Sequence, residues 1–432
     1  MEAPLAQRHY RRNALVIFLD YVAFGLGLAL SHPATVLPAF VQQLTTSTLA
    51  LSLVGVISGG GWQLPQLVAA RFLTHRPRMK PYLIGAGLVG RPLWWGLALL
   101  LWLGFSRPSW AVLAFFFLVL ALFWVTDALA VIAWFDVLAK VIPTERRGRL
   151  IGLSQFVSGL MAAGAGVLVG RLLGPDGPPF PQNYAILFAL AGLSYMLGLA
   201  ALTVIREPPG MVDAPMPSWR DYLPLLGRTL RDDALFRRLV LVRLLVGLEQ
   251  MVTPFYVVYA IEELGFSQAA VGGFVAAQTL GGVAGSLGLG LVADRKGTWR
   301  VIQLSGLASL SAPLVALGLY LGGVQAGDRL AILFVWVFAA IGIVGSALMV
   351  GYFNYALEIT PPDQRPVYMG LLNALSGTLV LAPLLGGWIL TLSSFPTLFG
   401  VATCGIAIGL ALTPGLGEGR QHRMAYLGGE SY

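Results

Sequence analysis

Residues 109–140 read SWAVLAFFFLVLALFWVTDALAVIAWFDVLAK. Only three of these residues, Asp127, Asp136 and Lys140, carry a charge. A helix that crosses a lipid bilayer needs about 20 mostly apolar residues. This stretch therefore predicts a membrane-spanning helix, and the rest of the chain repeats its character.

The composition extends this prediction to the whole chain. Of the 432 residues, 57% are apolar or aromatic and 11% are charged, whereas soluble domains carry roughly 25% charged residues. So few charges could not cover the surface of a water-soluble protein. This excludes soluble enzymes, nucleic-acid-binding modules and disordered chains, and it indicates a multi-pass membrane protein.

Twelve stretches have the length and apolarity of a membrane span. They cover residues 13–42, 49–73, 81–104, 109–140, 148–173, 184–205, 235–262, 268–293, 300–322, 329–356, 365–391 and 394–414. The predicted fold is therefore all-α, with twelve transmembrane helices.

Basic residues are concentrated in alternate loops. If both termini lie inside, 23 of the 28 Lys and Arg residues face the cytoplasm, and three, Arg107, Arg171 and Arg329, face outwards. Loops rich in Lys and Arg remain cytoplasmic. We therefore expect both termini on the cytoplasmic side of a bacterial inner membrane.

The chain repeats one plan twice. After the fourth span, residues 143–152 read PTERRGRLIG, and after the tenth span, residues 361–370 read PPDQRPVYMG, an offset of 218. Repeats of this kind are common in transporters. The predicted organisation is an N-terminal bundle of six helices (1–205), a central loop with a possible surface helix over 219–231 (206–234), a second bundle of six helices (235–414) and a tail (415–432).

The loop between the eighth and ninth spans carries a motif, GLVADRKGTWR, at residues 290–300. It is similar to the G-x-x-x-D-R-x-G-x-x-R signature of the major facilitator superfamily, which the two-bundle layout also resembles. The matching residues are Gly290, Asp294, Arg295, Gly297 and Arg300. This resemblance implies a secondary transporter that works by alternating access.

The first half departs from this signature. Its loop, RFLTHRPRMK at residues 71–80, has no Asp. If a latch between helix ends exists, only Asp294 can supply its carboxylate.

Five charged residues fall inside predicted spans, namely Asp20, Arg91, Asp127, Arg243 and Glu249. Ionisable groups in hydrocarbon are costly and mark a pathway or a buried pair. If each Arg pairs with one carboxylate, one acid is left to exchange a proton. We predict Glu249 in that role, followed by Asp127, and the alternative is that all five form static networks.

The spacing of these charges restricts their partners. Arg243 and Glu249 are six residues apart, about 240° around a regular helix, so they cannot pair along it. Arg243 and Asp20 lie at similar depth, which suggests a cytoplasmic gate between them. Arg91 would brace either Asp20 or Asp127.

Uncharged polar residues also fall in spans that line the cavity in this superfamily. They are Gln63, Gln66, Gln155, Gln250, Tyr256, Gln278, Asn354 and Asn373. Gln155 and Asn373 are equivalent at the offset of 218, which favours a substrate site between the halves. Hydrogen bonds between helices are the alternative.

We therefore expect a secondary active transporter of a small hydrophobic or amphipathic molecule, coupled to protons and directed outwards. The alternatives are an importer of a polar solute and a non-transporting receptor or scaffold. No ATP-binding G-x-x-x-x-G-K-[ST] sequence occurs, and no acid pair or His cluster indicates an enzyme or a metal site. The expected partners are the bilayer, the substrate and a proton or other coupling ion, with no cofactor, for a monomeric protein.

Overall fold

The computed structural model describes residues 10–73, 76–105, 107–209, 229–360 and 364–417. All regular secondary structure in these ranges is helical. The predicted all-α fold is therefore confirmed.

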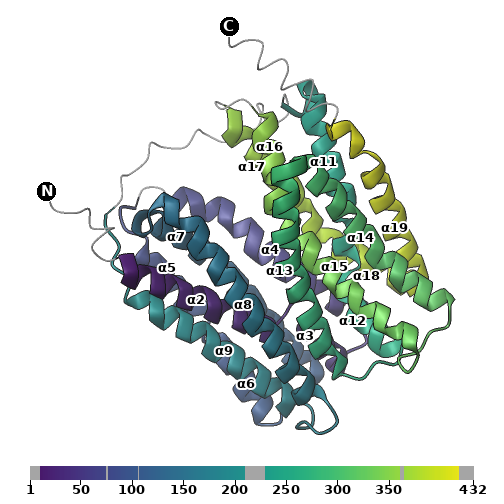
Figure 1. The fold of residues 1–432 in the computed structure, drawn as a ribbon. Helices are drawn as coiled ribbons and strands as arrows, with labels where there is room; N and C mark the ends of the chain where they lie inside the picture. The colour runs from purple at the N-terminus through teal and green to yellow at the C-terminus, as the bar shows by residue number, and fades with distance from the viewer. Residues whose placement is uncertain (1–9, 74–75, 106, 210–228, 361–363, 418–432) are drawn as a thin grey trace, which may run out of the picture. The chain divides into compact units, whose positions relative to one another are not determined.

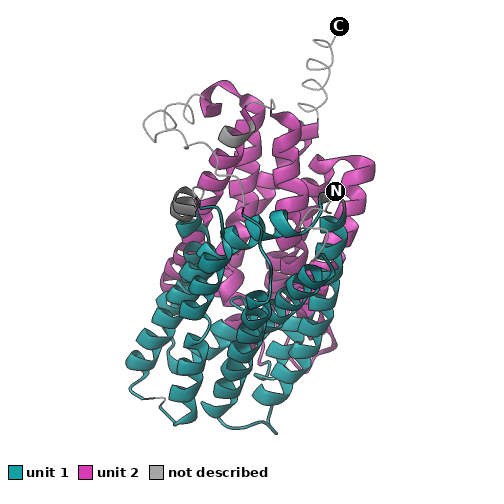
Figure 2. Ribbon diagram, turned by 90° about the vertical axis from the view of Figure 1, so that its left-hand side faces the viewer, with its two compact units in different colours: residues 1–216, 266–276 teal, residues 217–265, 277–432 magenta. Residues whose placement is uncertain are grey.

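The chain forms two compact units, which Figure 2 shows in two colours. The first unit comprises residues 1–216 and 266–276, and the second comprises residues 217–265 and 277–432.

The first unit is a bundle of long helices (Figure 1). Its helices are α2 (Tyr10–Leu30), α3 (Val36–Leu44), α4 (Thr48–Leu73), α5 (Lys80–Gly90), α6 (Leu93–Trp102), α7 (Ser109–Val141), α8 (Thr144–Leu173) and α9 (Gln182–Thr203). Helix α2 packs against α8 and α9, and α7 packs against α4 and α5. Aromatic side chains such as Phe40, Trp94, Phe123 and Tyr195 fill the space between them and are almost completely buried.

The helical segments of the second unit are more numerous, and several of them are short. They are α11 (Ala234–Val246), η1 (Gly247–Met251), α12 (Thr253–Glu262), α13 (Ala270–Lys296), α14 (Thr298–Leu321), η2 (Arg329–Leu333), α15 (Phe334–Ala347), η3 (Leu348–Phe353), α16 (Asn354–Ile359), α17 (Arg365–Ser376), η5 (Gly377–Leu381), α18 (Ala382–Leu392) and α19 (Phe395–Ala411). Helix α14 packs against α15 and α19, while α11 packs against α17 and α19.

The helices account for the twelve predicted spans. Eleven helical segments of the described chain are long and apolar enough to cross a membrane. Helix α4, 26 residues long, supplies the twelfth position, and its sequence carries three consecutive glycines and two glutamines that lower its mean hydropathy. The predicted surface helix over 219–231 lies largely outside the described residues.

Several spans are interrupted. The first span breaks between α2 and α3, and the third breaks at Arg91 and Pro92, between α5 and α6. In the second unit, the 3₁₀ turn η1 interrupts the seventh span, the π turn η3 the tenth, and the 3₁₀ turn η5 the eleventh.

Glycines allow close helix packing in the second unit, as small residues do in membranes. A Cβ atom at Gly281 would collide with the backbone of Ala339, and one at Gly342 would collide with the backbone of Gln278 and Gly282. Helices α13 and α15 can therefore approach this closely only with glycine at these positions.

Candidate functional site

Buried charges occur in both units, and their surroundings differ. In the first unit, the charged side chains are Asp20, Arg91 and Asp127, and in the second they are Arg243 and Glu249. Because a charge in hydrocarbon needs partners, the hydrogen bonds of each group indicate whether it is fixed or free to change its protonation.

Asp20 in α2 forms an ion pair with Arg91. Arg91 Nη1 lies 3.4 Å from Asp20 Oδ1, and the exposed fractions of the two side chains are 6% and 5%. The same nitrogen donates to the carbonyl oxygen of Tyr195 at 2.9 Å, and Trp134 Nε1 donates to Asp20 Oδ2 at 2.9 Å. Both carboxylate oxygens of Asp20 therefore have a partner, and the pair links α2, α7 and α9 to the junction of α5 and α6.

The packing around this pair leaves little space. The guanidinium of Arg91 lies over the ring of Phe24, 5.3 Å from its centre. A Cβ atom at Gly198 would lie 2.9 Å from Asp20 Oδ1, so glycine lets α9 approach the carboxylate. Arg91 thus braces Asp20, one of the two partners that the sequence leaves open, while the gate between Asp20 and Arg243 stays a prediction.

Asp127 in α7 is half-buried. Arg91 and Asp20 interact with it electrostatically, and among the described residues it forms neither an ion pair nor a hydrogen bond. Asp127 therefore remains a second candidate for proton exchange.

Glu249 lies on the 3₁₀ turn η1 of the seventh span. Pro254 follows in the first turn of α12 and has no N–H to donate to the preceding turn, which accounts for the irregular backbone here. The Glu249 residue is 5% exposed. Its carboxylate accepts a hydrogen bond from Ser309 Oγ at 3.4 Å, the one that its oxygens make within the described chain, although a carboxylate can accept about four.

Arg243 lies six residues before Glu249 and has an aromatic partner. Its guanidinium lies 5.4 Å from the ring centre of Tyr352, which is on the π turn η3. No ion pair joins Arg243 to Glu249 in the described part of the chain, in keeping with their spacing. The two groups are nevertheless close enough to influence each other electrostatically.

Three buried polar atoms, on residues that interact electrostatically with Glu249, have no hydrogen-bond partner among the described residues. They are Arg243 Nε, Tyr256 Oη and Tyr352 Oη. Buried polar groups are nearly always hydrogen-bonded in proteins. A cluster that retains unused donors beside a carboxylate is therefore suited to bind a polar group of a ligand or water.

The interrupted spans meet at this cluster. The turn η1 contacts η5, and η3 contacts α14, the helix that carries Ser309. A Cβ atom at Gly247 in η1 would lie 3.1 Å from Leu379 Cδ2 in η5 and would also meet Arg243. Broken helices in transporters commonly surround binding sites, because irregular backbone is tolerated in a membrane where it lines a cavity.

The other polar residues that the sequence predicts occur in both units. Gln66 Nε2 donates to the carbonyl oxygen of Trp62, and Gln155 is exposed. Asn373 is exposed in α17. A substrate site between the halves that uses Gln155 and Asn373 stays a prediction.

Four further predicted residues differ in their surroundings. Asn354 Nδ2 donates to the carbonyl oxygen of Val350. Gln278 Oε1 is buried without a partner in the described chain, and Gln63 and Gln250 are half-buried. Of the predicted polar residues, Tyr256 is the one that lies at the Glu249 cluster.

The loop signature forms the turn between α13 and α14. Gly297 has a φ angle of +85°, which favours glycine, and Gly290 lies within α13. Asp294 and Arg295 are exposed, and Asp294 forms no hydrogen bond or ion pair within the described ranges. Arg300 lies over the ring of Trp299, so a latch that uses Asp294 stays a prediction.

Trp134, Ser309 and Tyr352 contact the buried charges but were not predicted from the sequence. A signal for Ser309 exists, because it lies 218 residues after Arg91, and the repeat therefore makes the two equivalent. The first helices of the two halves are offset by 226 residues, which makes Asp20 equivalent to Val246, and Ser309 Oγ contacts the Val246 carbonyl oxygen at 3.2 Å. The Arg91 contact to α2 thus has a counterpart in the second unit.

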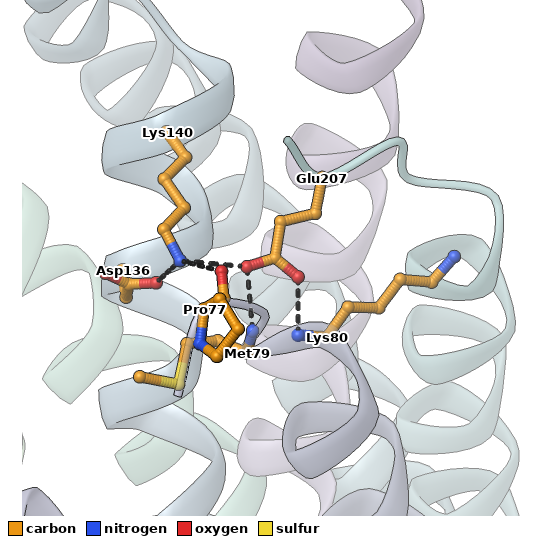
Figure 3. A network of polar contacts seen from close by, with 6 residues as sticks. All are labelled: Pro77, Met79, Lys80, Asp136, Lys140 and Glu207. Atoms are coloured by element: carbon orange, nitrogen blue, oxygen red, sulfur yellow. Dashed lines mark hydrogen bonds and ion pairs between the residues drawn. The ribbon is translucent and has the colours of Figure 1, made fainter. Parts of the chain in front are cut away.

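A polar network at one end of the first unit was also missed (Figure 3). Glu207 Oε1 accepts from the backbone N–H of Met79 at 2.7 Å, and Glu207 Oε2 accepts from that of Lys80 at 2.8 Å. Lys140 Nζ lies 3.1 Å from Glu207 Oε1 and also pairs with Asp136. Glu207 thus caps α5 and ties the chain that follows α9 to α7.

Comparisons with known proteins agree with this architecture. Residues 239–422 match the family model described as Major Facilitator Superfamily. A search of curated protein sequences finds no match.

Solved transporter structures share the fold over nearly the whole chain. A mutant of the nucleoside transporter NupG has a TM-score of 0.69 at 11% identity, covering 94% of this chain and 98% of its own. A D-xylose-proton symporter has a TM-score of 0.64 at 16% identity, covering 94% and 97%. A mutant of the peptide transporter POT has a TM-score of 0.66 at 15% identity, covering 94% and 95%. The predicted resemblance to the major facilitator superfamily is thereby confirmed: the chain is a multi-pass membrane protein with the superfamily's fold, and residues 239–422 match its family model.

Proposed function

We propose that this protein is a proton-coupled secondary transporter that moves a small hydrophobic or amphipathic molecule outwards by alternating access. The observation that carries the proposal is the environment of Glu249. Its carboxylate is buried, receives one hydrogen bond from Ser309, and lies on an interrupted span. The fold is that of secondary transporters, and the coupling and the substrate are our inference.

The chemistry of Glu249 suits reversible protonation. An ionised carboxylate in hydrocarbon is costly without a paired cation, so the neutral acid is favoured while the site is closed. When water reaches the site, it solvates the carboxylate, so the ionised form is no longer unfavourable and the proton can leave. Arg243, with its unused Nε donor, and Tyr352 would then hold a polar group of the substrate.

The pair of Asp20 and Arg91 in the first unit supports a different role. Asp20 has Arg91 and Trp134 as partners, so its ionised form is stabilised in place. We assign this pair to the structural frame of the first bundle, and we assign coupling to the second bundle.

Flux measurements in proteoliposomes test this proposal. A thermal-shift screen of the purified protein first identifies compounds that bind, and their flux is then followed under an imposed pH gradient. We expect Glu249→Gln to abolish proton-driven flux because the amide cannot release a proton, while exchange of substrate at equal pH persists. Glu263→Gln, at an exposed position at the end of α12, is the matched control.

Two outcomes would contradict the proposal. Undiminished proton-driven flux in Glu249→Gln would remove this residue from coupling. Binding of a compound without flux in either direction would instead support the receptor alternative.

A further inference from the structure

Two adjoining cavities open at one end of the first unit, where α5 begins and α9 has ended. The first, of about 520 Å³, is lined by Arg78, Lys80, Pro81, Ile205, Arg206, Glu207, Pro208 and Pro209. The second, of about 440 Å³, is lined by Arg76, Pro77, Arg78, Pro81, Tyr82 and Pro209. The charge count of the sequence predicts that this end is cytoplasmic.

The one acidic residue that lines these cavities does not neutralise them. Glu207 directs its carboxylate towards Lys140 and the backbone N–H groups of Met79 and Lys80 (Figure 3). Its side chain is 2% exposed. The negative charge of Glu207 is therefore buried and already compensated.

Two arginines give the cavities a positive surface. Arg76 and Arg78 are exposed, and neither forms an ion pair among the described residues. The guanidinium of Arg76 lies 5.8 Å from the ring centre of Tyr82, which keeps it near the start of α5. Two guanidinium groups close in sequence suit a phosphate, which they bind with paired hydrogen bonds.

An apolar stripe continues from the cavities along α5. Tyr82, Leu88 and Val89 are 38%, 55% and 56% exposed, and Gly85 has no neighbouring atom within 4 Å of the position of a Cβ. Residues 82, 85 and 89 lie on one face of a helix because they are three and four positions apart. The basic cavities therefore adjoin an open apolar face of a membrane-spanning helix.

We propose that these cavities bind the headgroup of an anionic phospholipid, with its phosphate at Arg76 and Arg78 and an acyl chain along the exposed face of α5. The apolar stripe favours a lipid over a free phosphate ion, which would use the arginines alone. Basic pockets beside membrane helices are suited to such headgroups. This site is separate from the transport site around Glu249, and its test does not depend on transport.

Native mass spectrometry of the delipidated full-length protein, titrated with phosphatidylglycerol, tests the proposal. We expect one tightly retained lipid. The double variant Arg76→Gln/Arg78→Gln should weaken the affinity for this lipid about 30-fold, because each basic residue near an anionic headgroup contributes roughly a fivefold increase in affinity. The double variant Arg107→Gln/Arg329→Gln removes two exposed arginines elsewhere and should keep the lipid.

Further measurements identify the ligand and distinguish loss of the site from loss of the fold. Arg76→Lys/Arg78→Lys retains the charges and should recover most of the affinity, while a variant that has lost its fold would not. Phosphatidylcholine should bind at least tenfold more weakly, and inorganic phosphate should not displace phosphatidylglycerol. Equal retention by the Gln variant and its control, or displacement by inorganic phosphate, would overturn the proposal.

Discussion

Asp20 and Glu249 show how the same functional group acquires different roles from its neighbours. Asp20 has an arginine and an indole N–H on its two oxygens. Glu249 has one hydroxyl at 3.4 Å. Charge-assisted hydrogen bonds are roughly twice as strong as neutral ones, so the ionised form is held firmly at Asp20 and weakly at Glu249.

Amide substitutions should separate these roles by their effect on stability. Asp20→Asn leaves the buried Arg91 without its counter-ion, and we expect a loss of about 3–5 kcal/mol in the free energy of unfolding. Glu249→Gln leaves no unpaired charge of its own, and we expect a change below about 1 kcal/mol. Chemical unfolding in detergent, followed by intrinsic fluorescence, compares the two. Equal losses would show that Glu249 is as firmly integrated into the fold as Asp20.

The unused hydroxyl of Tyr352 leads to a second prediction at this scale. Tyr352→Phe retains the ring against Arg243, and removing a buried hydroxyl without a partner should change stability by less than about 1 kcal/mol. If the hydroxyl binds the substrate, KM should rise about tenfold at unchanged stability. Tyr355→Phe loses the 2.8 Å hydrogen bond to the Leu416 carbonyl oxygen, and this control should lower stability without changing KM.

The sequence could locate the buried charges but only some of their partners. Hydropathy identifies charged residues within apolar runs, as it did for Arg91 and Glu249. Helix periodicity cannot show which helices are neighbours, so Trp134 and Tyr352 had no detectable signal. Ser309 could have been found, because the internal repeat aligns it with Arg91.

At the scale of the helices, proline accompanies several irregularities, although Pro65 and Pro313 lie inside the continuous helices α4 and α14. Pro92 follows the break at Arg91, Pro254 follows η1, and Pro383 follows η5. Each lacks an N–H for the preceding turn, so these positions could be predicted as kinks. The π turn η3 contains no proline. A π turn is equivalent to one extra residue in a helix, and in a fully apolar span this extra residue does not change the hydrophobic pattern, so η3 could not be predicted from the sequence.

The contact between α13 and α15 yields a prediction for paired glycines. A Cβ atom at Gly342 would collide with the backbone of α13, whereas one at Gly345, one turn later, would meet nothing within 4 Å. We expect Gly342→Ala to lower stability by about 1–3 kcal/mol through overpacking. Gly345→Ala should be neutral or slightly stabilising, because alanine is the better helix former. Thermal unfolding in detergent measures both, and equal effects would contradict the close contact.

For the whole molecule, the helical character and the approximate number of membrane spans followed from sums over long segments. A span is identified from about 20 residues together, so a wrong assignment of a few residues does not change the count, and the twelve helical spans were predictable. The alternation of basic loops depends on the same count, and it predicts the orientation that the following experiment tests.

Cysteine labelling checks this orientation. Cys404 is the one native cysteine, so Cys404→Ala gives a background in which a new thiol reports on its own position. In intact cells, an impermeant maleimide should label Gly327→Cys, which lies in a loop predicted to be external. It should label Asp232→Cys, in the predicted cytoplasmic loop, only after lysis. Labelling of both in intact cells would refute the predicted topology.

The cap formed by Glu207 also determines where the polypeptide can be divided. Residues up to Pro209 contribute to the folded first unit, because Glu207 closes the start of α5 and holds Lys140. Two co-expressed fragments separated after residue 209 should therefore reassemble into a working carrier. If the chain is divided before Glu207, the first fragment lacks the residue that caps α5 and pairs with Lys140, and we expect it to assemble less well.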